Sequence, residues 1–320
     1  MFQNAKVLIA GGSGFVGTNL ILKMLDLGAD VYATVHRKPL QITDDRIHIV
    51  PADLLKPEDC INTARGMDYI FMCAANTSGA AVMENTPLAH VVPNVIMNTN
   101  MLDAAYQAKV KKFLFISSNT VYPPYEHPVK EEEAFTGELF EKYFCVGWMK
   151  RFAEIECEMY AAKIKNPMKI VVVRPGNLYG EYDDFEWETS HVLPALIRKV
   201  VERHAPVEVW GDGKDQKDFL YIKDFIDGVV LAMEKMDSFA PINLANGASI
   251  SVREALDVIA RTDHYDDMQV KYSTDKPSMI PVRRISAEKA EQVLGFKART
   301  PFEEGIANTV KWYRKQTGKK

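Results

Sequence analysis

The stretch IAGGSGFVG, residues 9–17, stands between an apolar run and the beginning of an amphipathic segment. In such a stretch Gly11 permits a tight turn, Gly14 lets backbone N–H groups approach a pyrophosphate, and Gly17 lets a helix pack closely on the preceding strand. The N-terminus of that helix then faces the anion. Glycines are common in any turn between a strand and a helix, but here strand, loop, helix and next strand follow in the required order. The stretch therefore predicts a dinucleotide-binding turn.

The first half of the chain alternates short apolar runs with longer helical segments. The runs have no polar face, as strands of a parallel sheet covered by helices on both sides require. They are KVLIA (6–10), DVYATV (30–35), IHIV (47–50), DYIFMCA (68–74), KFLFIS (112–117) and KIVVVRP (169–175). Helices are expected between them, for example over Gly17–Leu27 and Asn98–Ala108. This alternation predicts an α/β fold with a doubly wound parallel sheet of the Rossmann type, whose sites lie at the carboxyl ends of the strands.

The pattern loosens in the second half of the chain, with polar loops at residues 180–190 and 210–218 and a closing amphipathic segment over Phe302–Gln316. We expect a dinucleotide-binding domain over residues 1–175 and a smaller α/β substrate domain over residues 176–320, with some interleaving of segments. No linker or internal repeat separates the two, so they should share an interface.

Composition excludes several classes of protein. The 320 residues are 47% hydrophobic, and 39 basic against 43 acidic residues leave a net charge of −4. This balance argues against a nucleic-acid partner or an anionic membrane surface. The four cysteines are scattered without a CxxC pair, so no metal site or disulfide framework is expected. Because the sequence also has no export signal and no apolar run of membrane-spanning length, we expect a reduced, cytoplasmic protein.

The end of the second strand bears on the choice of dinucleotide. His36, Arg37 and Lys38 offer positive charge where a site for NAD usually has a carboxylate, so NADP is favoured, with NAD as the alternative. An exposed basic turn would look the same. Asp53, after the third strand, is placed to reach the adenine region, although acidic residues in such turns are often caps.

Four further motifs carry a resemblance to a known family: SSNTVYP (117–123), the helix around Lys150, RPGNLYG (174–180) and SHVLPALIRK (190–199). With them the chain resembles the extended short-chain dehydrogenase/reductase family of nucleotide-sugar enzymes over nearly its whole length. Within that family it is similar to the GDP-L-fucose synthases, which are epimerase-reductases. The resemblance implies a second domain that binds a nucleotide sugar.

The family uses a hydroxyl residue, a tyrosine and a lysine to move a proton while hydride is transferred. Ser118 matches the hydroxyl, and Lys150 matches the lysine that also holds the nicotinamide ribose. The same register puts Val146 where the family has its tyrosine, and valine cannot donate, accept or titrate. Tyr143, one turn earlier, is either a substitute acid or a packing residue.

Two more departures concern the residues after Ser118. Dehydratases of the family have an Asp-Glu pair where this chain has Asn119 and Thr120, which argues against 4,6-dehydration. Fucose synthases have a cysteine at the position of Thr120, and threonine is too weak an acid to serve as that base. The epimerase half of the reaction therefore lacks one of its usual groups.

His191 matches a histidine of the family that moves a proton, while Asn177 and Lys217 match positions that contact the nucleotide sugar. A histidine that opens a helix and an exposed lysine are also ordinary surface features. The residues expected to contact the substrate are Ser118, Thr120, Asn177, His191 and Lys217. The residues expected to contact the cofactor are Gly11, Gly14, Phe15, Val16, Gly17, His36, Arg37, Asp53, Leu54, Ala74 and Lys150.

These features predict an NAD(P)-dependent oxidoreductase or epimerase that acts on a nucleoside-diphosphate sugar, with a GDP-sugar favoured and hydride transfer at C4. Ser118, Lys150, His191 and Tyr143 are the candidate catalytic residues. The alternative is a non-catalytic partner or sensor that retains cofactor and sugar binding. The resemblance also implies a homodimer joined through two long helices of the cofactor domain. The remaining histidines and all four tryptophans have no motif context, and core or surface positions are expected for them.

Overall fold

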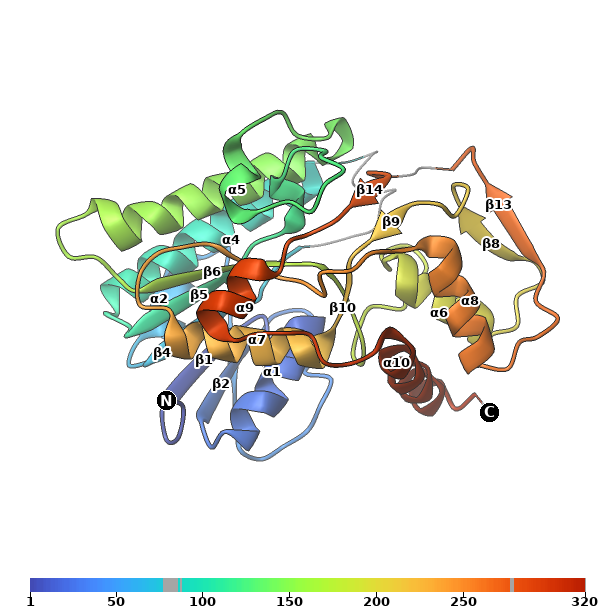
Figure 1. The fold of residues 1–320 in the computed structure, drawn as a ribbon. Helices are drawn as coiled ribbons and strands as arrows, with labels where there is room; N and C mark the ends of the chain where they lie inside the picture. Colours follow the sequence, from blue (N-terminus) through green and yellow to red (C-terminus); the bar gives the residue numbers. More distant parts are fainter. Residues whose placement is uncertain (77–85, 87, 277–278, 320) are drawn as a thin grey trace.

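The computed structural model describes residues 1–76, 86, 88–276 and 279–319. Its centre is a sheet of seven parallel strands in the order β11-β6-β5-β4-β1-β2-β3 (Figure 1). The strands are β1 (Lys6–Ala10), β2 (Asp30–Val35), β3 (Ile47–Pro51), β4 (Tyr69–Met72), β5 (Lys112–Ile116), β6 (Ile170–Pro175) and β11 (Ile242–Leu244). The predicted doubly wound parallel sheet is confirmed.

Helices cover both faces of this sheet, which explains why the central strands are apolar on both sides. One face carries α1 (Phe15–Asp26), α7 (Ile222–Lys235) and α9 (Glu288–Leu294). The other carries α2 (Pro57–Ala64), α4 (Leu88–Gln107) and α5 (Phe144–Glu158), which continues into a π-helical turn, η4 (Met159–Lys163). Every residue of β6 is buried, as a central strand of such a sandwich requires.

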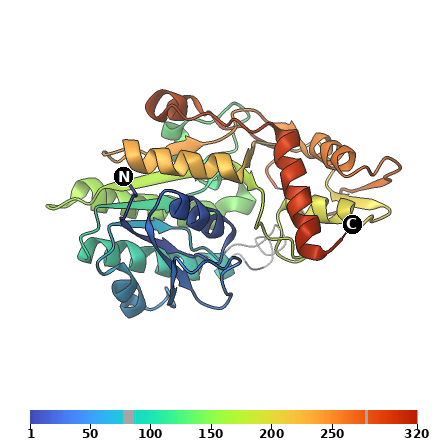
Figure 2. The ribbon, with the colours of Figure 1, turned by 90° about the horizontal axis from the view of Figure 1, so that it is seen from below.

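A smaller unit lies beside the sheet, with the N-terminus on the larger unit and the C-terminus on the smaller one (Figures 1 and 2). It contains α6 (Val192–Val201), α8 (Val252–Thr262), α10 (Phe302–Thr317) and short strands. The strands are β7 (Asn177–Tyr179) paired with β10 (Phe219–Tyr221), β8 (Val207–Trp210) paired with β13 (Val270–Ser273), and β9 (Gln216–Lys217) between β12 (Ile250–Ser251) and β14 (Val282–Arg283). No described helix is long and apolar enough to cross a membrane.

The chain crosses between the two units more than once. After β6 it builds part of the smaller unit, then returns to the large sheet with α7 and β11, which pairs with β6. A division after residue 175 therefore does not separate the sheet from the smaller unit, because the seventh strand comes from residues 242–244.

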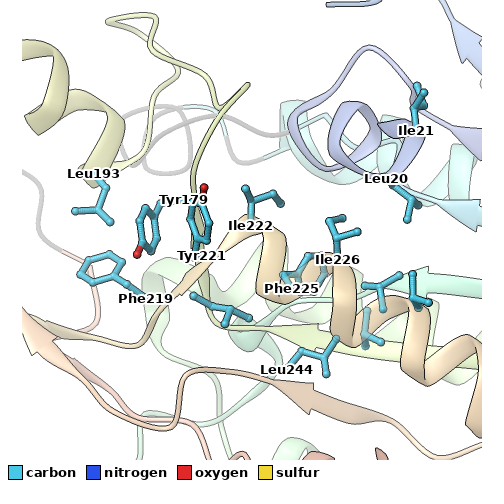
Figure 3. Packing of buried hydrophobic residues seen from close by; sticks show 14 of the residues in the cluster. Leu20, Ile21, Tyr179, Leu193, Phe219, Tyr221, Ile222, Phe225, Ile226 and Leu244 are labelled. Atoms are coloured by element: carbon cyan, nitrogen blue, oxygen red, sulfur yellow. The ribbon is translucent and has the colours of Figure 1, made fainter. Parts of the chain in front are cut away.

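One hydrophobic core runs through both units (Figure 3). Tyr179, Phe219 and Leu193 of the smaller unit belong to the same buried cluster as Phe225 and Leu20, which pack on the sheet. A continuous core resists sliding of one unit on the other. The two units are therefore held in one arrangement.

The long helix α4 begins ten residues before the predicted Asn98. Its first half reverses the usual pattern: His90 and Asn94 are buried, whereas Leu88, Val92 and Ile96 are exposed. Periodicity could not reveal this half because apolar residues normally mark the buried face. The other predicted helices are confirmed within two residues as α1 and α10.

The close packing of the glycine turn leads to a prediction about the free energy of unfolding. A Cβ at Gly17 would lie 2.1 Å from the Gly11 carbonyl oxygen, whereas a Cβ at Gly14 would lie at an ordinary 3.4 Å from the same atom. We expect Gly17→Ala to lower the free energy of unfolding by about 1–3 kcal/mol. Gly14→Ala, the matched control, should change it by less than about 0.5 kcal/mol. Denaturant unfolding followed by circular dichroism measures both, and equal effects would contradict the packing role assigned to Gly17.

Candidate active site

The strand order reverses between β1 and β4, and the loops that leave these strands diverge there to open a crevice. Gly11 lies at this point in a left-handed conformation with φ of 91°. A Cβ on it would lie 2.6 Å from Cα of Ala74, so only glycine lets the two loops come this close. Gly14 then caps α1, and among the described residues no side chain caps the N–H groups of its first turn. This turn, with Phe15 and Val16 half-buried behind it, fits a pyrophosphate.

The outer end of the crevice carries the residues expected to contact the ribose and the adenine. His36 and Arg37 are exposed immediately after β2, where a 2′-phosphate could reach them. Asp53 is half-buried, and its carboxylate accepts the Leu55 N–H at 3.1 Å, so it caps its own turn. Leu54 is buried, and its carbonyl accepts a hydrogen bond from Asn100 at 3.1 Å.

Lys150 lies on α5 beneath the carboxyl end of β5. Its Nζ donates to the Ile116 carbonyl at 2.9 Å and lies 4.8 Å from the centre of the Phe115 ring. Burial lowers the pKa of Lys150 to about 8, against the opposing charges of Glu154 and Cys157. The ammonium is therefore still charged at neutral pH but poorly solvated, which makes it a strong donor to a ribose hydroxyl or a developing alkoxide.

Ser118 begins a short turn, η1 (Asn119–Val121), directly after β5. Its Oγ accepts hydrogen bonds from the Thr120 N–H at 3.2 Å and from the Thr120 hydroxyl at 3.0 Å. Because both contacts use Ser118 as the acceptor, its own hydroxyl proton stays available for a substrate oxygen. Thr120 therefore has a role in this chain, which is to hold Ser118 as a donor.

Val146 is half-buried one turn before Lys150 on α5. Tyr143 precedes this helix, in η3 (Glu141–Tyr143), and turns toward the smaller unit, where its hydroxyl accepts the Ile280 N–H. Burial raises the pKa of Tyr143 to about 12. Among the described residues, Tyr143 and Lys150 contact different neighbours. A role for Tyr143 as substitute acid therefore stays a prediction.

Lys217 is buried on β9 and donates to the Ile280 carbonyl, with Asp215 3.6 Å away. Asn177 on β7 donates its side-chain amide to the Asp218 carbonyl at 3.2 Å. Both predicted sugar contacts are thus engaged by the protein, and a substrate would have to compete for them. His191 is exposed at the N-cap of α6.

A model of the NAD dependent epimerase/dehydratase family matches residues 7–245. The chain belongs to this family. The family is NAD(P)-dependent, so the predictions of an enzyme and of a nicotinamide dinucleotide cofactor are confirmed. The cradle of Gly11, Gly14 and Gly17 is the part of this chain that fits the cofactor.

The similarity to known proteins covers nearly the whole chain. Probable GDP-L-fucose synthase 1 of Oryza sativa subsp. japonica is 28% identical over 97% of this chain and 92% of its own length. GDP-L-fucose synthase of Escherichia coli (strain K12) is 29% identical over 96% of each chain. A GDP-6-OMe-4-keto-L-xylo-heptose reductase from C. jejuni has a similar structure, with a TM-score of 0.85, 23% identity and coverage of 99% of both chains. The structural likeness shows that the two proteins share their fold.

A buried polar network that the sequence did not reveal supports this site of the family fold. Arg174 on β6 donates two hydrogen bonds, of 2.9 and 2.6 Å, to the carboxylate of Glu154 on α5, and both side chains are 2% exposed. Ser117 donates to the same carboxylate. Arg174 also donates to the Tyr122 hydroxyl at 2.9 Å, and Tyr122 in turn donates to Asn243 on β11.

This network holds the two halves of the candidate site together. Glu154 lies one turn after Lys150 on the same helix, and Ser117 directly precedes Ser118. The ion pair therefore fixes the lysine helix against β6, and the hydrogen bond from Ser117 fixes it against the segment that carries Ser118. A charged residue inside the apolar run KIVVVRP was the available signal, since arginine is seldom buried without a partner.

Removing one partner of this ion pair should lower the free energy of unfolding much more than removing both. We expect Glu154→Gln to lower the free energy of unfolding by about 3–5 kcal/mol, because it leaves a buried guanidinium without its counter-charge. The double variant Glu154→Leu/Arg174→Leu should recover more than half of that loss, since no buried charge remains. Urea unfolding of the wild type, both single variants and the double variant tests this. Simple addition of the two single effects would contradict it.

Proposed function

We propose that this protein is an NADP-dependent nucleotide-sugar oxidoreductase that reduces a GDP-4-keto sugar at C4 and works without the usual tyrosine. The observation that carries the proposal is that Lys150 and Ser118 both lie at the carboxyl end of β5. Lys150 is a charged and poorly solvated donor, and Ser118 is held with its proton available. The GDP-L-fucose synthases among its relatives and a GDP-heptose reductase among similar folds support the substrate class.

The nicotinamide supplies hydride to the sugar when it is bound. Ser118 would donate its hydroxyl proton to the C4 oxygen as a hydrogen bond and so polarise the carbonyl. Lys150 would hold the nicotinamide ribose and, as a cation in a poorly solvated place, stabilise negative charge that develops nearby. The loss of a general acid costs about 10²–10⁴-fold in rate. Catalysis can persist because these electrostatic contributions remain.

His36 and Arg37 support NADP over NAD, because both are exposed at the end of β2 where the 2′ group of the cofactor lies in this fold. In the smaller unit an open groove supports the nucleotide half of the substrate. Its lining residues are Gly213, Lys214, Gln216, Ser251, Arg253 and Glu254. Basic side chains there suit a diphosphate, and Trp210, 44% exposed at the end of β8, offers a surface for a base.

Restoring the tyrosine tests the proposal directly. We expect Val146→Tyr to raise the rate of NADPH-dependent reduction of a GDP-4-keto sugar, by up to about 10²-fold, because it returns an acid beside Lys150. Lys150→Met should lower the rate by at least about 10²-fold. Mass analysis of the sugar, which gains two hydrogens on reduction, measures the product.

Val146→Phe is the matched control, since it adds an aromatic ring without a hydroxyl. If Val146→Tyr and Val146→Phe behave alike, Val146 does not occupy the acid position. No hydrogen gain from any GDP-4-keto sugar, despite bound NADPH, would contradict the reductase and favour a non-catalytic binding role.

We also propose that the protein is a homodimer joined through α4 and α5, which lie side by side (Figure 1). Exposed apolar side chains recur every three or four residues along α5 and along the first half of α4, and together they are called the stripe here. They are Leu88, Val92 and Ile96 on α4 and Phe144, Trp148, Phe152 and Ile155 on α5, with Met159 directly after it. A stripe of this kind on two adjacent helices suits a self-complementary interface.

A charge inside the stripe should separate the subunits. We expect Trp148→Glu to convert a dimer into a monomer, because Trp148 is 42% exposed in the middle of the stripe. Ile49→Glu, at a residue 58% exposed on the edge strand β3, is the control and should leave the dimer intact. Size-exclusion chromatography with light scattering gives the mass. A monomeric wild type, or dissociation by both variants, would contradict this interface.

A further inference from the structure

Residues 181–183, called the linking segment here, lie between the cofactor turn and the smaller unit. They follow β7 almost directly and are fixed to the smaller unit by two side chains. Tyr221, at the end of β10, donates its hydroxyl proton to the Glu181 carboxylate at 2.7 Å. The centre of the Tyr182 ring lies 5.2 Å from that of the Trp312 ring on α10. The linking segment therefore shares its position with β10 and α10.

Two amide side chains of the larger unit hold the same segment from the cofactor side. Asn19 on α1 is buried, and its Nδ2 donates to the Glu181 carbonyl at 2.9 Å. Gln41, in the loop between β2 and β3, donates from Nε2 to the Tyr182 carbonyl at 3.2 Å and to the Ser13 carbonyl at 3.3 Å. Ser13 belongs to the glycine turn itself. Gln41 therefore bridges the turn that fits the pyrophosphate and the linking segment.

The linking segment has a shape that its own residues disfavour. Tyr182 has a left-handed backbone with φ of 68°, which is unfavourable for a residue other than glycine. Asp183 is 9% exposed, and no donor in the described part of the chain reaches its Oδ2. A buried carboxylate oxygen without a partner also costs free energy. Both features persist only where the surroundings impose them, and such positions cluster at functional sites.

The loop that carries Gln41 also carries the basic residues expected to contact the 2′ group of the cofactor. Residues 36–39 and Gln41 are exposed, and a loop with little buried surface opens readily. The Ser13 hydroxyl donates to the Lys38 carbonyl at 2.7 Å, so this loop and the glycine turn are in direct contact. A dinucleotide that contacts both would order the loop, and with it the bridge that Gln41 makes to the linking segment.

We propose that Gln41 is a positioning residue through which a bound dinucleotide orders the linking segment and so strengthens binding of the GDP-sugar to the smaller unit. The linking segment follows the strand of Asn177, and β10, which Tyr221 ends, begins two residues after Lys217. Both predicted sugar contacts thus lie on strands next to the linking segment or held by it. Coupling of two binding sites is reciprocal, so the GDP-sugar strengthens binding of the dinucleotide by the same factor. The effect on the GDP-sugar rests on the proposed function, whereas the ordering by the dinucleotide does not.

The first test needs no sugar. Hydrogen exchange of the backbone amides, followed by mass spectrometry, is measured with and without saturating NADPH. We expect NADPH to slow exchange in residues 181–185 of the unaltered protein by about 5-fold or more. Gln41→Met keeps the length of an exposed side chain but has no N–H donor, so it should fold and lose this protection. Gln107→Met is the matched control, since Gln107 is exposed and donates to Asp103 within α4. Absence of protection in the unaltered protein, or full protection in Gln41→Met, would overturn the proposal.

The second test measures the Kd of GDP by titration calorimetry, with and without NADPH. In the unaltered protein and in Gln107→Met, we expect NADPH to lower the Kd of GDP by about 5-fold or more. In Gln41→Met the change should fall below about 2-fold. A Kd of GDP that is the same with and without NADPH in the unaltered protein would overturn the coupling. Failure of GDP to bind in either state would instead contradict the proposed substrate class, and the exchange experiment would still decide the role of Gln41.

Discussion

The buried ion pair between Arg174 and Glu154 is the contact on which the candidate site depends. It joins the strand β6 to α5, the helix that packs on one face of the sheet. Both charged side chains are almost completely removed from water. Such a pair adds little net stability, because desolvation offsets the attraction, but it tolerates only one geometry. That geometry sets the helix of Lys150 against the turn of Ser118. The catalytic arrangement therefore follows from the packing of the sheet rather than from the loops that surround it.

With Val146 at the predicted position of the tyrosine, the remaining groups must do the work of an acid. Thr120 donates two hydrogen bonds to Ser118 and so holds Ser118 as a donor. Proton handling is then separate from the polarisation of the carbonyl, which Ser118 would provide. Burial lowers the pKa of Lys150 to about 8. The ammonium of Lys150 is therefore poorly solvated, and the proposed reaction relies on this desolvation.

Local sequence patterns predicted the sheet, because its strands are short apolar runs. They also predicted the glycine turn, because Gly11 and Gly17 stand where a Cβ would clash with backbone atoms. These patterns did not predict the features that depend on packing between segments far apart in the sequence. The three residues of β11 carry no signal that they join the large sheet, and the first half of α4 buries its polar face. The pairing of Glu154 with Arg174 arises only when α5 and β6 are in place.

The transfer of hydride to C4 by a chain with Val146 is the central claim. The most direct measurement uses NADPH carrying deuterium at the transferable position of its nicotinamide, incubated with the unaltered protein and a GDP-4-keto sugar, followed by NMR of the product. The account predicts deuterium on C4 of the sugar and at no other carbon. Absence of label from the sugar, while the protein binds both NADPH and the GDP-sugar, would contradict it.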